Sequence, residues 1–182
     1  TYNGPEKKEF AGYDTSFFHS AGPYRGFKRD PTDGGIRMPM IARWPGNIEA
    51  GATSNHVGYF GDVFATAAEL CGQEAPANLD SISFVPTLLG RPKDQKDHEF
   101  LYWEYLGGTP SQAVLLDGRW KGIRSGSATA PLELYDLKAD VSETRNVAAS
   151  HADVVAKVEA CLKKARTPAE NWPLFAPRAT VR

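Results

Sequence analysis

Cysteine is scarce in this sequence, with two residues among 182. Cys71 and Cys161 stand far apart in unrelated contexts, and their spacing matches no cysteine-based metal site. We interpret them as two buried thiols in preference to a disulfide. The cysteines therefore predict no metal centre and leave the redox compartment undetermined.

Long apolar runs and an excess of one charge are also missing. No stretch is apolar enough to span a bilayer, and nothing near Thr1 resembles a signal peptide. The formal net charge of −1 favours neither nucleic acid nor an anionic membrane, so neither is predicted as a partner. Residues 1–5 read as the end of a strand entering a turn, so we expect the chain to begin within a longer protein.

The most informative segment runs from Gly22 to Gly46. Its first part is a glycine-rich loop that carries Lys28, and its second part, Ile36 to Arg43, predicts a short buried strand. Glycine lets the backbone approach a ligand closely, and a lysine on such a loop is a point charge for an anion. Loops delivered by strands often carry the chemistry of α/β enzymes. The segment therefore predicts an anion-binding element.

The remaining patterns predict an α/β fold in two parts, residues 1–91 and residues 92–182. In the first part, Asp62 and Gly72 bound a predicted helix whose apolar face includes Phe64 and Cys71. The second part predicts a small antiparallel sheet covered on one face by a C-terminal helix. Its expected elements are strands at 100–105, 113–116, 119–123 and 132–137, a hairpin turn at Asp117-Gly118, a helical stripe over 154–165, and a capping box of Ser150 and Asp153.

Several strings, in this order, resemble the formylglycine-dependent sulfatases of alkaline-phosphatase-like fold. The loop 22–28 and the Asp33-Gly34-Gly35 turn resemble that family's G-P-L-R-G-x-K loop and acid-Gly-Gly. Further matches are Trp44-Pro45-Gly46, the string 80–90, Gly118-Arg-Trp-Lys121, and the string 133–137 with Glu143 and Asn146. The resemblance implies that residues 1–91 end a sulfatase α/β sandwich domain and that 92–182 form its small C-terminal subdomain.

By this resemblance, Lys28 is a catalytic and substrate-binding residue that contacts the sulfate, and Asn3 is a Ca²⁺ ligand. The family's aspartate beside that asparagine is Tyr2 here, which leaves open a weakened metal site, a pseudo-enzyme or a misassigned start. The formylglycine nucleophile arises in a C/S-x-P-x-R motif that is absent from this sequence. We therefore expect the chain to depend on an N-terminal remainder and to be inactive alone.

Other residues have structural interpretations. For Arg25, Arg29 and Arg37, ion pairs to Asp30 and Asp33 are favoured over contact with sulfate. The four histidines show no metal or dyad spacing. For the aromatic residues Tyr102, Trp103, Tyr105 and Trp120, core packing is favoured over a sugar-stacking surface.

The function predicted by the resemblance is hydrolysis of a sulfate ester of a small molecule or glycan. Two alternatives stay open: a phosphomonoesterase or phosphonate hydrolase of the same superfold, and a non-catalytic anion- or glycan-binding relative. The resemblance implies a periplasmic or secreted location, which the residues themselves do not fix. They also do not name the substrate, although the stretch 107–111 is a candidate specificity loop.

Overall fold

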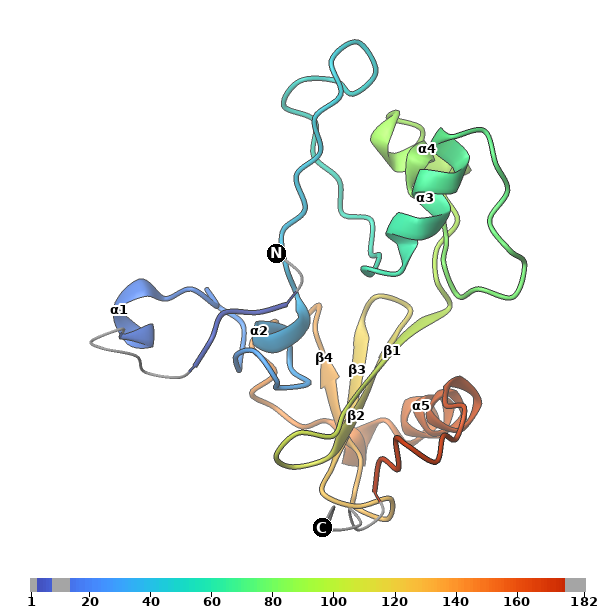
Figure 1. Cartoon of the computed structure of the whole chain (residues 1–182). Coiled ribbons are helices and arrows are strands. Elements are labelled where there is room, and N and C mark those ends of the chain that lie inside the picture. Colours follow the sequence, from blue (N-terminus) through green and yellow to red (C-terminus); the bar gives the residue numbers. More distant parts are fainter. Residues whose placement is uncertain (1–2, 8–13, 176–182) are drawn as a thin grey trace. The chain divides into compact units, whose positions relative to one another are not determined.

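The computed structural model describes residues 3–7 and 14–175. These residues form two compact units (Figure 1): one joins the described residues up to Met38 to those from Phe100 onward, and the other is residues 39–99. The N-terminal loop region thus belongs with the C-terminal sheet in one compact unit. The domain boundary at 91/92 stays a prediction.

The larger unit is built on an antiparallel sheet of order β1-β2-β3-β4. Its strands are β1 (Phe100–Tyr105), β2 (Ser111–Leu116), β3 (Trp120–Ser125) and β4 (Glu133–Asp136). The predicted hairpin is confirmed, because Asp117 and Gly118 both have positive φ, of 53° and 62°, between β2 and β3. The Arg119 N–H donates to the Leu116 carbonyl at 3.0 Å, so Asp117 and Gly118 are the central residues of a β-turn whose positive φ values match the twist of the flanking strands.

One face of the sheet is covered by α5 (Ala152–Ala165), as the apolar stripe predicts. Val158 and Leu162 of the helix pack against Val114 and Leu134 of the sheet, forming the main core. The capping box is wrong: the N-cap residue is His151, and no side-chain cap bond forms. Short helical turns, α1 (Thr15–Phe18), α2 (Asp33–Ile36) and the 3₁₀ turn η2 (Ala148–Ser150), complete this unit.

The smaller unit contains α3 (Asp62–Leu70), α4 (Val85–Leu88) and the 3₁₀ turn η1 (Pro92–Asp94). Its central polar residue is Asp62, which is fully buried. The Asp62 carboxylate accepts hydrogen bonds from the backbone N–H of Tyr59 and of Ile82, and lies 3.0 Å from Nε2 of His98. A buried carboxylate needs such partners, so this residue ties the loops around α3 together.

Three sequence predictions in these regions are wrong. Residues 37–43 form no strand: Ile41 is 94% exposed, and no partner strand pairs with the segment among the described residues. A strand needs a neighbour to take its backbone hydrogen bonds. The face of α3 is also different, since Asp62, Ala65 and Thr66 are buried while Phe64 is exposed. Cys71 is an exposed free thiol, whereas Cys161 is buried as predicted.

Candidate active site

The sheet face opposite α5 carries the loop that contains Lys28 (Figure 1). Side chains alternate between the two faces of a strand, so the register decides which residues lie under the loop. Val114 and Leu116 face α5, which places their alternate neighbours on the other side. This loop-side face includes Trp103 and Tyr105 on β1, Ser111 and Ala113 on β2, Lys121 and Ile123 on β3, and Glu133 and Tyr135 on β4.

A buried ion pair fixes the loop to this face. Lys121 Nζ donates to Asp33 Oδ1 at 2.7 Å, and both side chains are almost wholly removed from solvent. Arg37 pairs with the other oxygen of Asp33 at 3.3 Å. Lys121 also lies 5.4 Å from the centre of the Trp103 ring, a cation–π distance. The pair links α2 at the end of the loop to the middle of β3.

Glu143 completes this buried cluster from a third part of the chain. Its Oε2 accepts a hydrogen bond of 2.7 Å from the backbone N–H of Asp33, and its backbone has a positive φ of 51°. The residue is fully buried, and Oε1 is buried without a hydrogen-bond partner among the described residues. Burial raises the pKa of Glu143, while the nearby Lys121 charge opposes the rise. The Lys121 ammonium thus pairs directly with Asp33 and acts on Glu143 through its charge.

Glycines allow the loop to fold this tightly. A Cβ atom on Gly34 would lie 2.1 Å from the carbonyl oxygen of Gly26, and one on Gly35 would lie 2.2 Å from that of Asp30. Both distances are too short for any side chain. The Asp33-Gly34-Gly35 turn therefore serves close backbone packing in α2, and it does not lead into a strand.

Lys28 lies at the edge of this loop, which the buried Asp33–Lys121 ion pair holds against the sheet. Its backbone N–H donates to the carbonyl of Pro5 at 2.8 Å, and its ammonium lies 3.9 Å from Glu6 Oε2. Arg29 pairs with the same carboxylate at 2.9 Å and has a positive φ of 84°. The Lys28 side chain is 31% exposed, so it remains accessible to a ligand.

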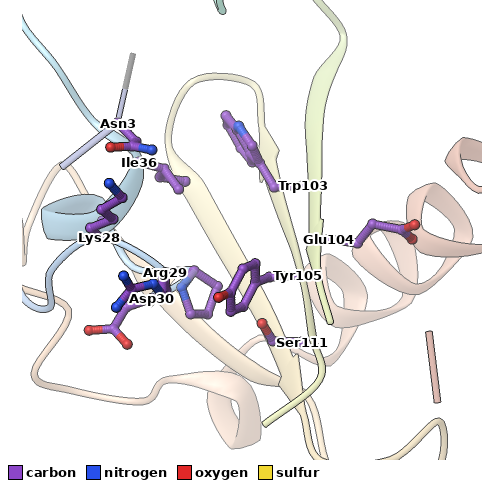
Figure 2. Close-up of a pocket in the computed structure, with 11 residues that line it drawn as sticks. Asn3, Lys28, Arg29, Asp30, Ile36, Trp103, Glu104, Tyr105 and Ser111 are labelled. Atoms are coloured by element: carbon purple, nitrogen blue, oxygen red, sulfur yellow. The ribbon is translucent and has the colours of Figure 1, made fainter. Parts of the chain in front are cut away.

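Asn3 lies beside Lys28 in a cavity of about 290 Å³ (Figure 2). The neighbouring Gly4 donates its N–H to the carbonyl of Gly35 at 2.8 Å, which holds this short segment against α2. The two candidate residues, 25 positions apart in the sequence, therefore line one site. The other lining residues are Arg29, Asp30, Pro31, Gly35, Ile36, Trp103, Glu104, Tyr105 and Ser111.

The arginine interpretations are confirmed in part. Arg37 pairs with Asp33 as predicted, but Arg29 pairs with Glu6. The Arg25 guanidinium lies 4.7 Å from the centre of the Tyr135 ring. Asp30 instead accepts the backbone N–H of Phe27 at 2.9 Å, which shapes the turn after the glycine loop. The histidine interpretation missed the contact between His98 and Asp62, residues separated by 36 positions.

The structural importance of Lys121 and Glu143 is not predicted from the sequence. Both belong to strings that resemble the sulfatase pattern, but the sequence alone predicts no role for either. One signal was available for Lys121, because it shares a strand face with the apolar residue Ile123. A lysine at an inward position in a strand must find a buried partner. Nothing local identifies that partner as Asp33.

Neither a metal centre of protein ligands nor a membrane-spanning helix is found in the part of the chain that the structure describes. Within residues 3–7 and 14–175, no group of three or more His, Cys, Asp or Glu side chains is arranged to hold a metal ion. Over the same residues, no helix has the length and apolar character needed to cross a bilayer. Tyr2 lies outside the described residues.

The ion pair generates a stability prediction. We expect Lys121→Met to lower the free energy of unfolding by about 3–5 kcal/mol, because it leaves the buried Asp33 carboxylate without its ammonium partner. Arg119→Met is the matched control, since Arg119 makes an ion pair with Asp136 at the surface, where such pairs contribute little. Urea unfolding would measure both. Equal small losses in the two variants would contradict the role given to Lys121.

A second prediction concerns pH and Glu143. Between the ordinary glutamate pKa of 4.5 and its raised pKa, the folded chain binds more protons at this residue than the unfolded chain does. This contribution to stability therefore falls as pH rises through that window. Glu143→Gln should remove that slope, whereas Glu69→Gln, on the exposed side of α3, should keep it. Urea unfolding at several pH values would test this, and unchanged slopes in Glu143→Gln would contradict it.

Comparison with known proteins agrees with this architecture. Residues 25–168 match the family model described as N-sulphoglucosamine sulphohydrolase, C-terminal. The chain is 32% identical over 161 residues to an N-acetylgalactosamine-6-O-sulfatase of Bacteroides thetaiotaomicron, covering 80% of this chain and 30% of that protein. It is 36% identical over 171 residues to an ulvan-active sulfatase of Formosa agariphila, covering 75% and 34%.

Solved structures give the same result. A structure from work on glycosaminoglycan metabolism by Bacteroides thetaiotaomicron aligns with a TM-score of 0.66 at 31% identity, covering 84% of this chain and 35% of that one. Another, in complex with its substrate D-glucosamine-2-N,6-O-disulfate, aligns with a TM-score of 0.60 at 25% identity, covering 72% and 28%.

The chain spans about a third of the length of these relatives. The family match covers most of the sheet unit, including α2, β1 to β4 and α5. The predicted fold class is therefore confirmed, with the four-stranded antiparallel sheet and its helix as the C-terminal part of an alkaline-phosphatase-like sulfatase fold. This chain belongs to the sulfatase family and corresponds to its C-terminal portion.

Proposed function

We propose that this chain is the C-terminal portion of a sulfuric-ester hydrolase and that Lys28 binds the sulfate group of its substrate. The supporting observation is the position of Lys28, on a loop clamped by buried charges and facing a cavity that also contains Asn3. The relatives named above are sulfatases, which supports the reaction class. The proposal extends their activity to the complete protein of which this chain would be part.

The role that we propose for Lys28 is electrostatic stabilisation of the sulfate group. An ammonium group beside the sulfate would bind a sulfate oxygen and offset the charge that develops on the departing alcohol. Such a group is effective only where its position is fixed before the substrate arrives. The buried ion pair of Asp33 with Lys121 supplies that rigidity within five residues of Lys28 in the sequence. Lys28, whose ammonium lies 3.9 Å from Glu6 Oε2, would exchange this contact for one with the incoming anion.

The metal and the nucleophile would come largely from an N-terminal remainder. Asn3 offers an amide oxygen, a hard donor that fits Ca²⁺, and its place beside Lys28 suits a metal close to the bound sulfate. The residues described here supply no fuller set of acidic ligands. A bound Ca²⁺ would polarise the sulfate, and a formylglycine hydrate would supply the attacking oxygen. This chain's own share is to hold the anion through Lys28 and to orient one ligand through Asn3.

The central test is Lys28→Ala in the complete enzyme. We expect kcat/KM for sulfate esters to fall about 100-fold or more, the usual effect of removing one preorganised donor. The melting temperature should change little, because the side chain is partly exposed. Lys163→Ala, an exposed lysine on α5, is the matched control.

An unchanged rate in Lys28→Ala would refute the assignment. The 182 residues assayed alone serve as the blank, since we expect no turnover without the remainder. Phosphate and phosphonate esters belong in the same assay. Faster turnover of either than of sulfate esters would favour the alternative hydrolase class, and binding without turnover by the complete protein would favour a non-catalytic role.

Asn3 has a separate test. If its amide oxygen binds Ca²⁺, Asn3→Ala in the complete enzyme should weaken calcium affinity, measured by calorimetry on chelator-treated protein. Asn47→Ala, at an exposed turn in the smaller unit, is the control. Asn3→Asp should retain most of the affinity, because a carboxylate is also a hard oxygen donor. Equal affinity in Asn3→Ala and the unmodified enzyme would remove Asn3 from the ligand set.

A further inference from the structure

Two aromatic rings of β1 face the same cavity as Lys28 (Figure 2). Trp103 and Tyr105 are two residues apart, so they lie on one face of the strand about 7 Å from each other along it. Their partners on β2 are small, since Trp103 pairs with Ala113 and Tyr105 with Ser111. Small partners leave both rings only partly covered, and each is half-buried. The sequence prediction of core packing therefore describes only part of their surroundings.

Both rings are supported from behind. Trp103 packs against the cluster of Ala113, Ile123 and Tyr135 and receives the Lys121 ammonium at 5.4 Å. Tyr105 lies over the backbone of Gly107, where a Cβ atom would come within 2.1 Å of the phenol oxygen. A glycine at 107 is thus required for this ring position. Rings held in place lose little conformational freedom when a ligand stacks on them.

The cavity has two chemically different sides. Lys28 and Asn3 lie at one side of it, and Tyr105 and Trp103 lie at the other (Figure 2). Arg29 and Asp30 add polar groups to its wall. The volume of about 290 Å³ is at the lower end of the range for small-molecule sites. A fitting ligand is compact, with an anionic group, an apolar ring face and polar edges.

A sulfated sugar has these properties. A pyranose ring presents C–H bonds on one face, which suit an aromatic surface, and hydroxyl groups at its edge for residues such as Asp30. A steroid sulfate would leave the polar wall groups without partners, which is costly when they are desolvated. Charge and shape therefore favour a carbohydrate over a large apolar alcohol.

We propose that Trp103 and Tyr105 form a stacking surface for the sugar ring of a sulfated carbohydrate whose sulfate group reaches Lys28. This inference rests on the proposed sulfatase function and adds the substrate class and two residues that select it. Lys28 recognises the anion, and the rings recognise the alcohol that leaves. The two roles can be separated by experiment, because free sulfate occupies only the first part of the site.

The experiment uses the complete enzyme and a panel of sulfated monosaccharides and disaccharides, with steryl sulfate and 4-nitrophenyl sulfate for comparison. We expect a sulfated sugar to have the highest kcat/KM. For that sugar, Tyr105→Ala should raise KM about 10-fold, the order of loss expected when an aromatic ring that stacks on a ligand ring is replaced by alanine. The inhibition constant of inorganic sulfate should stay the same. Trp103→Phe should raise KM less, and its melting temperature reports whether packing is intact.

Two controls separate the possible failures. Phe100→Leu alters a ring on the α5 face of the same strand and should leave KM unchanged. Lys28→Ala should weaken inhibition by inorganic sulfate, and its failure to do so would contradict the proposed function itself. If Lys28→Ala behaves as expected but Tyr105→Ala leaves KM unchanged, or alters sulfate inhibition equally, the stacking surface is refuted. Preference for steryl or 4-nitrophenyl sulfate over every sugar would also overturn it.

Discussion

Lys121 and Asp33 are 88 positions apart in the sequence and meet at 2.7 Å beneath the loop that carries Lys28. Removing two charges from water is costly, so the pair contributes less to stability than to geometry. Only one placement of the loop on the sheet brings both charges and the Glu143 carboxyl together. The positions of α2, the glycine turn and Lys28 all depend on that placement.

The two faces of the small sheet differ in composition and in what they contact. One face is apolar and packs against α5, with Gly122 so close to the helix that a Cβ atom would lie 2.4 Å from Val158. The other face holds charged and aromatic residues that meet the loop. A packed core on one side can fix the strands firmly enough for the polar cluster on the other to form without slippage.

The proposed site therefore contains groups for recognising a substrate but not those needed to cleave it. It combines a cation from a loop, an amide from the segment before it and aromatic rings from β1. These groups suit recognition of an anion and of the ring attached to it, whereas bond cleavage would need groups from elsewhere. This separation of recognition from bond cleavage is consistent with the length of the chain, which spans about a third of its sulfatase relatives.

Local signals in the sequence were sufficient for the sheet and its helix. Strand β1 has the predicted bounds, the Asp117-Gly118 turn forms the expected hairpin, and the stripe from Val154 to Ala165 packs on the sheet. These features depend on alternation, turn chemistry and helical period, which neighbouring residues carry. The resemblance to sulfatases, carried by ordered strings of residues, was confirmed by the family match.

Tertiary structure decided the rest. The segment 37–43 has strand-like composition but no ladder partner among the described residues, and α3 buries Asp62 because Tyr59, Ile82 and His98 satisfy its carboxylate. The sequence by itself determined that Lys28 sits on a glycine-rich loop, from which an anion-binding role is predicted. Only the tertiary structure brings Asn3 and Tyr105 to the same cavity and pairs Asp33 with Lys121. The physical reason is that buried charges pair with groups that are close in space, and a local sequence pattern does not contain that information.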